Sequence, residues 1–390
     1  MSAGDLTLHL KRSGLSTDAY VGQLHEIDNA KAVAQIERSV DYAGPLAGHK
    51  CGMFNAADGR KLLVTSSPKL IEPKRGKWPT LRKFFEQLLG TADEVLFAWM
   101  KVSLESLESG DMRPGQMIVF AGEAGCGKSL CQQIITQLLG GRCEKPFRYM
   151  VGDTPFNGDL GQAEHWCIED EHGSTDIRTR RKFGTAIKDV CANTLLSLHR
   201  KGAQALSLPV FRRITMSVNS EPENLQIIPP LDGSLLDKIT IFSCGRADVD
   251  SNRERAWKAF TGELSAFVYW LSNDFIIPQG MKCKRFGVKA YQDEALLNQL
   301  SSESPEQRLL NIVDEVIFDV KKDLAPEIVT ADELERRLRS SPFNFTVEKL
   351  LYFSSACAVY LQRLETKTPS RISSSREWGK RKWTIKPPQA

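Results

Sequence analysis

An eight-residue glycine-rich loop is the part of the sequence whose residue types and spacing most clearly serve chemistry. Residues 122–129 read Gly-Glu-Ala-Gly-Cys-Gly-Lys-Ser and fit the phosphate-binding pattern G-x-x-x-x-G-K-[ST]. Glycines let backbone N–H groups curl around a phosphate, and a following helix adds partial positive charge. The pattern therefore predicts ATP binding, with Lys128 on the β- and γ-phosphates and the Ser129 hydroxyl on Mg²⁺. The predicted nucleotide-binding residues are Gly122, Glu123, Ala124, Gly125, Cys126, Gly127, Lys128, Ser129 and Leu130.

An acidic run further along the chain supplies a second element of such a site. Residues 164–171 begin as an apolar strand and end in carboxylates. We expect Asp170 to bind Mg²⁺ through water and Glu171 to orient and deprotonate the attacking water, because both would stand at the carboxyl edge of a strand. A register shifted by one residue would give these roles to Glu169 and Asp170. An exposed acidic turn is the other alternative.

A third element is the apolar run 214–219, which closes with Asn219. Alone, an asparagine after a strand is a common turn residue. Its order after the phosphate loop and the acidic run favours a role for Asn219 in the same site.

The flanking elements needed to position these residues can also be recognised. Residues 116–120 are expected to form a buried strand before the loop, and Leu130, Ile134 and Leu138 repeat at helical spacing after it. A further strand is expected over 238–242 and a helix over 254–270. Upstream, we expect a strand at 59–65 and a helix from Pro79 to Gly90. The apolar face of that helix comprises Leu81, Phe84, Phe85, Leu88 and Leu89.

The C-terminal block carries concentrated positive charge. Residues 366–390 contain seven basic residues and one acid, Glu377. A capping box at 330–333 predicts a helix, a longer helix is expected over 347–364, and two short strands are expected near 371–372 and 383–385. This order suggests a winged-helix-like module in which Trp378 or Trp383 stacks or packs. An interaction domain that only buries Trp383 is the alternative. The expected phosphate contacts are Arg376, Lys380, Arg381 and Lys382.

Composition sets the class of protein. The chain has 390 residues, 41% of them hydrophobic and 26% charged, with a formal net charge of +4. These values are ordinary for a globular protein, and no run approaches the ~20 apolar residues of a transmembrane helix. The N-terminus lacks the features of a signal peptide. The nine cysteines are scattered without a C-x-x-C pair, so we expect reduced thiols in a cytoplasm and neither a zinc site nor a disulfide framework.

Taken together, residues 115–242 resemble the superfamily-three helicases, in particular the helicase module of primase–helicases from phages, prophages and large DNA viruses. The most specific part of the resemblance is Ser197-Leu198-His199-Arg200-Lys201-Gly202 followed by residues 205–208, which is similar to a β-hairpin with a basic tip. In that family the hairpin grips single-stranded DNA inside a hexameric ring. The resemblance thus implies DNA contacts from His199, Arg200 and Lys201. A solvated hairpin turn is the alternative.

The resemblance also bears on the catalytic groups. In AAA+ ATPases an asparagine in the position of Asn219 polarises the lytic water. Relatives commonly place an arginine after that strand to reach the neighbouring subunit's nucleotide, and here Lys238 is the nearest counterpart, without the planar fork of arginine. Other candidates for this trans-acting group are Arg212, Arg213 and Arg246. A second basic cluster, in the channel or at the subunit interface, comprises Arg178, Arg180, Arg181, Lys182 and Lys188.

We therefore expect an α/β fold with an AAA+ P-loop core. The expected domains are an N-terminal α/β region (1–90), the ATPase core (91–250), a helical lid (251–300) and a winged-helix-like basic domain (301–390). The expected function is a ring-forming, ATP- and Mg²⁺-dependent helicase that acts on single-stranded and forked DNA in replication of a phage, prophage or mobile element. The expected partners are further copies of the chain, as a hexamer, and a separate primase or initiator, with no membrane. A DNA-stimulated AAA+ switch or remodeller is the main alternative, and a small-molecule P-loop kinase is a weaker one.

Overall fold

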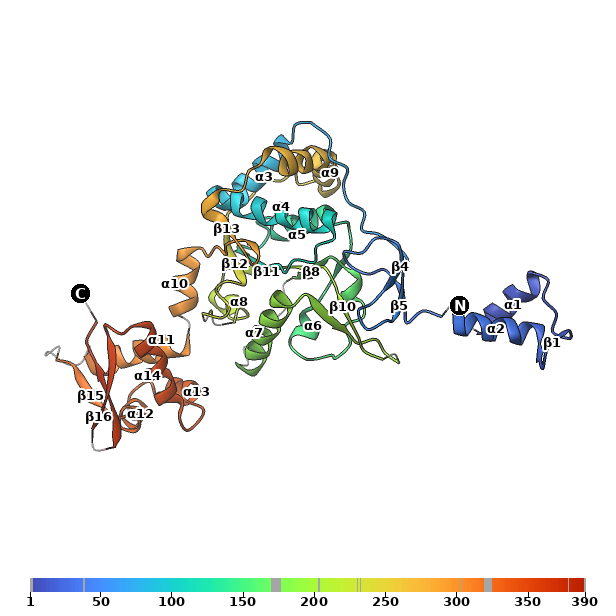
Figure 1. Ribbon diagram of the computed structural model, residues 1–390. Helices are drawn as coiled ribbons and strands as arrows, with labels where there is room; N and C mark the ends of the chain where they lie inside the picture. Colours follow the sequence, from blue (N-terminus) through green and yellow to red (C-terminus); the bar gives the residue numbers. More distant parts are fainter. Residues whose placement is uncertain are drawn as a thin grey trace.

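A computed structural model gives the fold of the chain. It describes residues 3–37, 39–169, 177–202, 204–229, 231, 233–302, 304–318, 325–377 and 379–388. The sheet-containing body occupies the middle of the molecule, with a pair of N-terminal helices on one side and the C-terminal block on the other (Figure 1). No helix in these ranges is long and apolar enough to cross a bilayer.

A five-stranded parallel sheet forms the centre of the body, in the order β12-β6-β11-β8-β7. Strand β6 lies between β11 and β12, which come much later in the chain. Residues far apart in sequence therefore meet at the carboxyl end of β6, where parallel α/β sheets commonly bind ligands. The strands are β6 (Met117–Gly122), β7 (Cys143–Glu144), β8 (His165–Ile168), β11 (Arg213–Asn219) and β12 (Ile239–Cys244).

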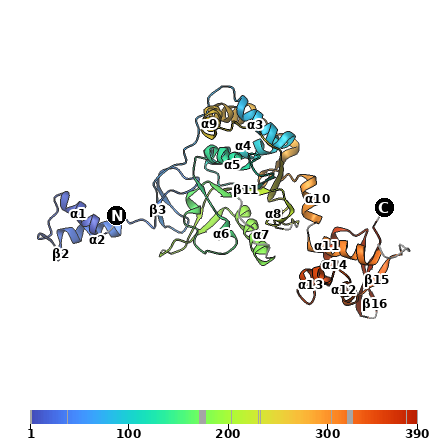
Figure 2. The same ribbon diagram turned by 180° about the vertical axis from the view of Figure 1, so that it is seen from behind.

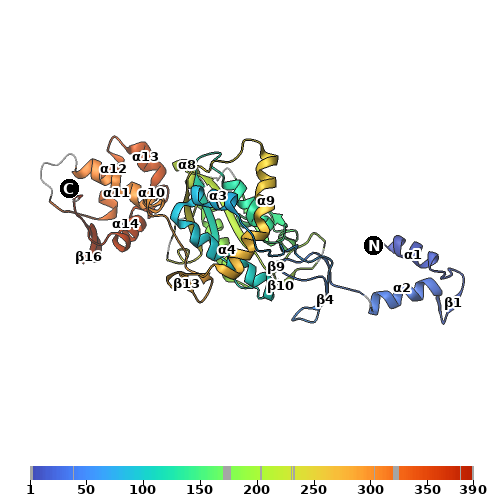
Figure 3. The same cartoon turned by 90° about the horizontal axis from the view of Figure 1, so that it is seen from above.

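The alternation of side chains along β6 separates two apolar clusters. Ile118 and Phe120 belong to the cluster on one face, whereas Met117 and Val119 belong to the cluster on the other. All six residues of β6 are buried, as expected for a parallel strand covered on both faces. The first face is covered by α3 (Pro79–Leu89), α4 (Asp93–Ser109), α5 (Lys128–Leu138) and α9 (Arg253–Tyr269). The view from above shows α3, α4 and α9 lying over the sheet (Figure 3).

The opposite face is covered by shorter elements. Their apolar residues form a continuous cluster with the sheet. These elements are α6 (Phe147–Met150), α7 (Ile177–Ala192), the hairpin β9 (Leu195–Leu198) and β10 (Leu206–Pro209), and the small sheet β3 (Tyr42–Gly44), β4 (Gly52–Asn55) and β5 (Lys61–Val64). Short α8 (Pro222–Leu225) follows β11, and the hairpin β13 (Lys282–Cys283) and β14 (Gly287–Val288) follows the π-helical turn Trp270–Asp274 after α9.

The N-terminal ninety residues do not pack as one unit. The helices α1 (Ala3–Arg12) and α2 (Glu26–Glu37), joined by the short strands β1 (Tyr20–Val21) and β2 (Leu24–His25), stand apart from the body in two opposite views (Figures 1 and 2). By contrast, Tyr42 and Val64 are buried in the cluster beneath the main sheet. Helix α3 buries its predicted apolar face, Phe84 and Phe85 included, against α4 and α9. Apolar residues before and after residue 90 therefore pack together in the same clusters.

The C-terminal block has an apolar cluster of its own, in which Trp383 is 1% exposed. The predicted capping box is present, with Thr330 and Glu333 bonding each other's backbone N–H groups. The prediction of one helix over 347–364 was wrong: α13 (Asn344–Leu350) ends before Ser354 and Ser355, poor helix formers, and α14 (Ala356–Lys367) begins after them. The other elements are α10 (Glu294–Ser302), α11 (Pro305–Val313), the π-helical turn Asp314–Phe318, α12 (Ala331–Arg339), β15 (Glu327–Val329), β16 (Ile372–Glu377) and β17 (Lys380–Ile385).

Strands β15, β17 and β16 form an antiparallel sheet in that order. The two predicted short strands are thus a single hairpin, longer than expected. Helices followed by a hairpin agree with the predicted order of elements, and the winged-helix assignment itself stays a prediction. For the chain as a whole, the fold class is α/β around a parallel sheet, in the manner of P-loop NTPases.

Candidate functional site

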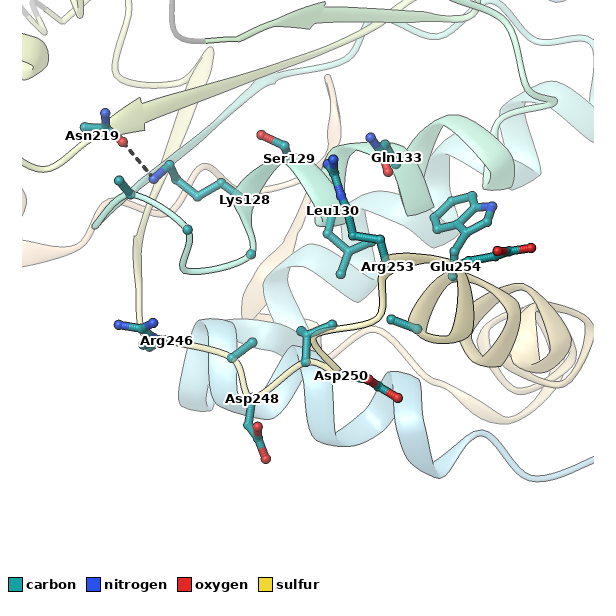
Figure 4. A pocket seen from close by; sticks show the side chains of 17 residues that line it. Lys128, Ser129, Leu130, Gln133, Asn219, Arg246, Asp248, Asp250, Arg253 and Glu254 are labelled. Carbon is teal, nitrogen blue, oxygen red and sulfur yellow. Dashed lines mark hydrogen bonds between the residues drawn. The ribbon is translucent and has the colours of Figure 1, made fainter.

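A large cavity lies at the carboxyl end of β6. Its volume is about 1010 Å³, and its wall comes from the glycine-rich loop, the end of β11, the segment after β12 and the start of α9 (Figure 4). The side chains that line it include Lys128, Ser129, Leu130, Gln133, Asn219, Arg246, Asp248, Asp250, Arg253, Glu254 and Trp257. The predicted loop residues Ala124, Gly125 and Gly127 line it as well.

The glycine-rich loop has a conformation that suits an anion. Gly125 and Gly127 have φ values of +74° and +119°, which side-chain-bearing residues rarely adopt. A Cβ on Gly127 would also come within 3.1 Å of the Phe84 ring on α3. Helix α5 starts directly after Gly127 and has no side-chain cap. Its first N–H groups therefore remain available to a phosphate, and the helix dipole favours negative charge there.

Lys128 lies at the centre of this loop and is 6% exposed. Its ammonium group donates hydrogen bonds to the carbonyl oxygens of Gly122 and Glu123, each at 2.7 Å, and to Oδ1 of Asn219 at 3.1 Å. The register explains the last contact, because Asn219 pairs with Gly122 across β11 and β6. Two residues that the sequence placed in one site are thus brought into direct contact (Figure 4).

The predicted acidic pair lies outside the described residues, so the structure gives no position for Asp170 or Glu171. Glu169, the alternative in a shifted register, directly follows β8 and pairs with Lys145 at 3.5 Å. It lines a second, smaller cavity. Strand β11 lies between β8 and β6 in the sheet.

Arg246, Arg253 and Trp257 are among the cavity residues that were not assigned to it from the sequence. Arg246 follows β12, Arg253 starts α9, and Trp257 lies one turn further along α9. No ion pair within the described part of the chain involves either arginine, whereas Asp248 pairs with Lys83 and Asp250 with Arg255. The cavity thus combines uncompensated positive charge with an aromatic wall. The one sequence signal that could have placed Arg253 and Trp257 near the nucleotide site is their position at the start of the predicted lid helix.

The predicted basic hairpin is present as β9 and β10, with Leu198 opposite Leu206. Its three basic residues differ in their surroundings. Arg200 donates a hydrogen bond to the carbonyl oxygen of Asp41 at 3.0 Å and lies over the Tyr42 ring, so it anchors the hairpin. The side chain of His199 is exposed, and its backbone N–H donates a hydrogen bond to Oδ1 of Asn157. Lys201 is exposed at the tip.

The surroundings of Lys238 argue against the trans-acting role predicted for it. It is 8% exposed, and its ammonium group donates to the carbonyl oxygen of Ser234 and to Oδ1 of Asp237. In this conformation the ammonium group is engaged within its own chain. Arg212 and Arg213 are equally buried, and burial lowers the pKa of Arg213 to about 9. Arg246 remains exposed, but it faces the cavity of its own chain.

The four residues predicted to contact DNA in the C-terminal block lie on strands β16 and β17, and not in a loop. Arg376 and Lys380 are exposed. Arg381 is held within the block by the Glu365 carboxylate at 2.8 Å and by the Trp383 ring, and Lys382 pairs with Glu377. Arg381 and Lys382 are therefore engaged within the block, and the phosphate contacts expected from these four residues stay a prediction. Trp383 packs in the interior, and Trp378 lies outside the described residues.

The second basic cluster is only partly exposed. Arg180 on α7 donates a hydrogen bond to the carbonyl oxygen of Ile228, and burial lowers its pKa. Arg181 and Lys182 lie on the same helix, and Lys188 follows two turns later.

The cysteines depart from the expectation drawn from their spacing. Cys143, His165 and Cys167 have potential ligand atoms within 4.8 Å of one another, the one such group of three His, Cys, Asp or Glu residues in the described ranges. The pairing of β7 with β8 brings these residues together. Because this pairing joins separate segments of the chain, a search for a C-x-x-C motif does not detect it.

Comparison with known proteins supports the fold. No known protein-family profile and no curated protein matches the sequence. Two solved apo structures of the NrS-1 C-terminal region match with TM-scores of 0.53 and 0.56 and identities of 12% and 13%. The alignments cover 98% of this chain and 99% and 98% of those chains. A JCV helicase structure aligns over 62% of each chain with a TM-score of 0.29, too low to carry an argument. The chain therefore shares its fold with the NrS-1 region along its length.

Proposed function

We propose that this chain is an ATP- and Mg²⁺-dependent helicase that forms a ring around single-stranded DNA. The observation that carries the proposal is the phosphate-loop geometry, in which the start of α5 has no side-chain cap and the Lys128 ammonium group contacts Asn219. The fold shared with the NrS-1 region and the basic hairpin are consistent with it. The helicase assignment itself comes from the sequence resemblance.

The residues of the cavity fit a magnesium nucleotide. The first backbone N–H groups of α5 have no side-chain acceptor and can donate to phosphate oxygens. The Lys128 ammonium group can replace its hydrogen bonds to two backbone carbonyl oxygens with hydrogen bonds to phosphate oxygens. Ser129 would hold Mg²⁺ together with Asp170, and the ion would neutralise charge on the phosphates. Arg246 and Arg253 add positive charge, and Trp257 offers a flat apolar surface to a base.

Asn219 is suited to the hydrolytic step. Its Oδ1 already accepts from Lys128, so the amide is oriented towards the place where the phosphates would lie. Once a nucleotide engages the ammonium group, that amide oxygen can accept a hydrogen bond from the attacking water, which Glu171 would deprotonate. In this proposal Lys128 binds the phosphates, Asn219 positions the attacking water and Glu171 acts as the general base.

DNA binding is proposed to centre on the hairpin tip. Lys201 is exposed, while Arg200 fixes the base of the loop to the β3 region. Six exposed tips around a ring would create a positive channel for a polyanion. Because Lys238 is buried, we place the trans-acting cation elsewhere and assign it to no single residue.

The test measures ATP hydrolysis with and without single-stranded DNA. We expect DNA to stimulate turnover, and Lys201→Ala to remove the stimulation while leaving nucleotide affinity unchanged. Lys69→Ala, an exposed lysine outside the hairpin, is the matched control. Displacement of a strand from a forked duplex then separates a helicase from a DNA-stimulated remodeller. ATP consumption with no strand released would favour the remodeller, and a strict monomer with nucleotide and DNA would exclude the ring.

A further inference from the structure

Two cysteines and a histidine project from one face of the sheet at its outer edge. His165 and Cys167 are two residues apart on β8 and so face the same side. Cys143 on the edge strand β7 pairs with His165 in the parallel register. The Sγ atom of Cys167 lies 3.3 Å from Nδ1 of His165, and all three ligand atoms lie within 4.8 Å of one another.

Buried neighbours fix the orientation of the imidazole. His165 is fully buried, and its Nε2 lies 2.9 Å from the hydroxyl oxygen of Thr215 on β11. Thr215 also accepts a hydrogen bond from Gln132 Nε2 at 2.8 Å. With Nε2–H donating to Thr215, Nδ1 is the nitrogen available as a ligand. The Sγ atom of Cys167 also lies 3.6 Å from Nε2, so the sulfur rests against the face of the imidazole, and the ring must turn for Nδ1 to face the thiols. A histidine metal ligand is ordinarily held by such an outer hydrogen bond from its other nitrogen.

One further group reaches the same nitrogen. The Thr136 hydroxyl on α5 lies 2.7 Å from His165 Nδ1, and it also lies 3.0 Å from the carbonyl oxygen of Gln132. Its single proton can be donated to that carbonyl. The Thr136 oxygen still stands next to Nδ1, so a cation bound there displaces this hydroxyl from the nitrogen, and the hydroxyl keeps the Gln132 carbonyl as its acceptor.

The donor set and spacing select the kind of ion. A tetrahedral Zn²⁺ lies about 2.3 Å from sulfur and about 2.0 Å from nitrogen, which puts its ligand atoms roughly 3.5–3.8 Å apart. The observed separations are close to that requirement, and a turn of the imidazole together with displacement of the Thr136 hydroxyl would complete the geometry. Two thiolates and one imidazole favour thiophilic ions over Mg²⁺ or Ca²⁺.

The group opens on a cavity of its own. Cys143 and Cys167 line a space of about 300 Å³, with Glu169 and Lys145 among the other lining residues. Three protein ligands with a fourth position open to such a space are the pattern of an exchangeable zinc site. Gln133 and Trp257 line both this space and the large cavity at the phosphate loop. The two spaces are therefore neighbours.

From this geometry we propose that Cys143, His165 and Cys167 bind one thiophilic d¹⁰ cation, for which Zn²⁺ is best suited. The ligand atoms are the two Sγ atoms and Nδ1 of His165, and the fourth position faces the smaller cavity. Binding releases the thiol protons to solvent. It also ties the edge strand β7 to β8, the strand that leads into the acidic run. This site is independent of the proposed helicase function.

Cobalt titration of the reduced full-length chain provides the test. Co²⁺ in a tetrahedral thiolate site gives a sulfur-to-metal charge-transfer band and intense visible bands, and Zn²⁺ should displace it because it binds such ligands more tightly. We expect one equivalent of Co²⁺ to produce these bands. Cys143→Ser should weaken binding by at least about tenfold, since loss of an outer-shell partner alone costs 10–100-fold.

Cys51→Ser is the matched control, because Cys51 and Cys143 are both exposed thiols and only Cys143 belongs to the group. The control should bind Co²⁺ as the unaltered chain does. Absence of the tetrahedral bands, or equal affinity in Cys143→Ser and Cys51→Ser, would overturn the proposal. So would a Cys143–Cys167 disulfide in protein kept under reductant, detected by mass after alkylation, because no thiolates would remain.

Discussion

The ammonium group of Lys128 donates a hydrogen bond to the side-chain oxygen of Asn219 at 3.1 Å, joining the phosphate loop to the end of the neighbouring strand. The two residues are far apart in the chain, and the parallel register of β6 and β11 sets them opposite each other. Lys128 also bonds two carbonyl oxygens, so Asn219 is the side-chain partner of a cation that is nearly buried. This contact supports two separable expectations.

Loss of the lysine should impair nucleotide binding. Lys128→Ala removes the one ammonium group in the loop, and hydrogen bonds to charged groups are worth about 1.5–3 kcal/mol. We expect ATP affinity to fall roughly 10- to 100-fold, measured by calorimetry or by a fluorescent nucleotide. Lys69→Ala should leave affinity unchanged. Equal affinity for Lys128→Ala and the unaltered chain would refute the site.

Loss of the asparagine should separate binding from turnover. Asn219→Ala leaves the loop and Lys128 in place, so nucleotide affinity should change by less than about threefold, whereas loss of one group that positions or polarises the reactants costs about 10²–10³ in rate. Steady-state ATP hydrolysis gives the comparison. A fall in affinity with unchanged turnover would instead make Asn219 a binding residue.

A buried ion pair should stabilise the sheet. The guanidinium of Arg142 makes a two-point contact with the fully buried Glu164 carboxylate, which also accepts from the backbone N–H of Gly48. Removing one partner of such a pair costs about 3–5 kcal/mol. We expect Glu164→Ala to lower the free energy of unfolding by about 3 kcal/mol in urea. The exposed pair of Glu72 with Lys74 is the control, and Glu72→Ala should cost less than about 1 kcal/mol.

The two neighbouring cations of the hairpin should behave differently. Arg200→Ala removes a hydrogen bond to the Asp41 carbonyl and a stacked contact with Tyr42, so we expect a loss of about 1–2 kcal/mol in stability. Lys201→Ala removes only an exposed side chain and should stay within about 0.5 kcal/mol. Urea unfolding of both variants decides the matter. Equal losses would show that Arg200 does not anchor the hairpin.

Local signals were sufficient for most elements of the core. The apolar runs before the loop and before Asn219 became β6 and β11, and the apolar face of α3 is buried as its spacing predicted. The capping box at Thr330 marked the start of α12. These features depend on neighbours within a few residues, which the sequence displays directly. One helix was wrongly predicted over 347–364 because the apolar spacing continues across Ser354 and Ser355. In the structure the helical conformation is interrupted there, between α13 and α14.

Contacts between distant segments were the part that the sequence did not predict. The inward position of Arg200 depends on Asp41 and Tyr42, which lie far away in the sequence. A basic side chain has the same appearance in the sequence whether it is exposed or bonded inside. The pairing of β7 with β8 likewise unites Cys143 with His165, although their spacing matches no metal motif. Such relationships arise only from strand order and register.

Acid should weaken the C-terminal block through one carboxylate. The side chain of Glu306, near the start of α11, is 4% exposed and accepts a hydrogen bond from Lys367 at 2.7 Å, with Arg363 at 3.6 Å. Burial acts to raise the pKa of Glu306, but the Lys367 ammonium and the Arg363 guanidinium outweigh it. The pKa therefore lies below the ordinary value of 4.5. A depressed folded-state pKa stabilises the block above the unfolded value, and that stability is lost as pH falls through 4.5 and on through the folded pKa.

Glu306→Gln keeps the shape of the side chain and removes its titration. At pH ~7 we expect this variant to be less stable than the unaltered chain by about 1.5–3 kcal/mol, the value of a charge-assisted hydrogen bond. Between pH ~7 and pH ~3 the difference should shrink towards zero, because the protonated glutamic acid then resembles glutamine. Urea unfolding at each pH measures it, with Glu348→Gln, on the exposed side of α13, as the control that should show no such convergence. A difference that stays constant with pH would mean that Glu306 acts through packing, and not through its charge.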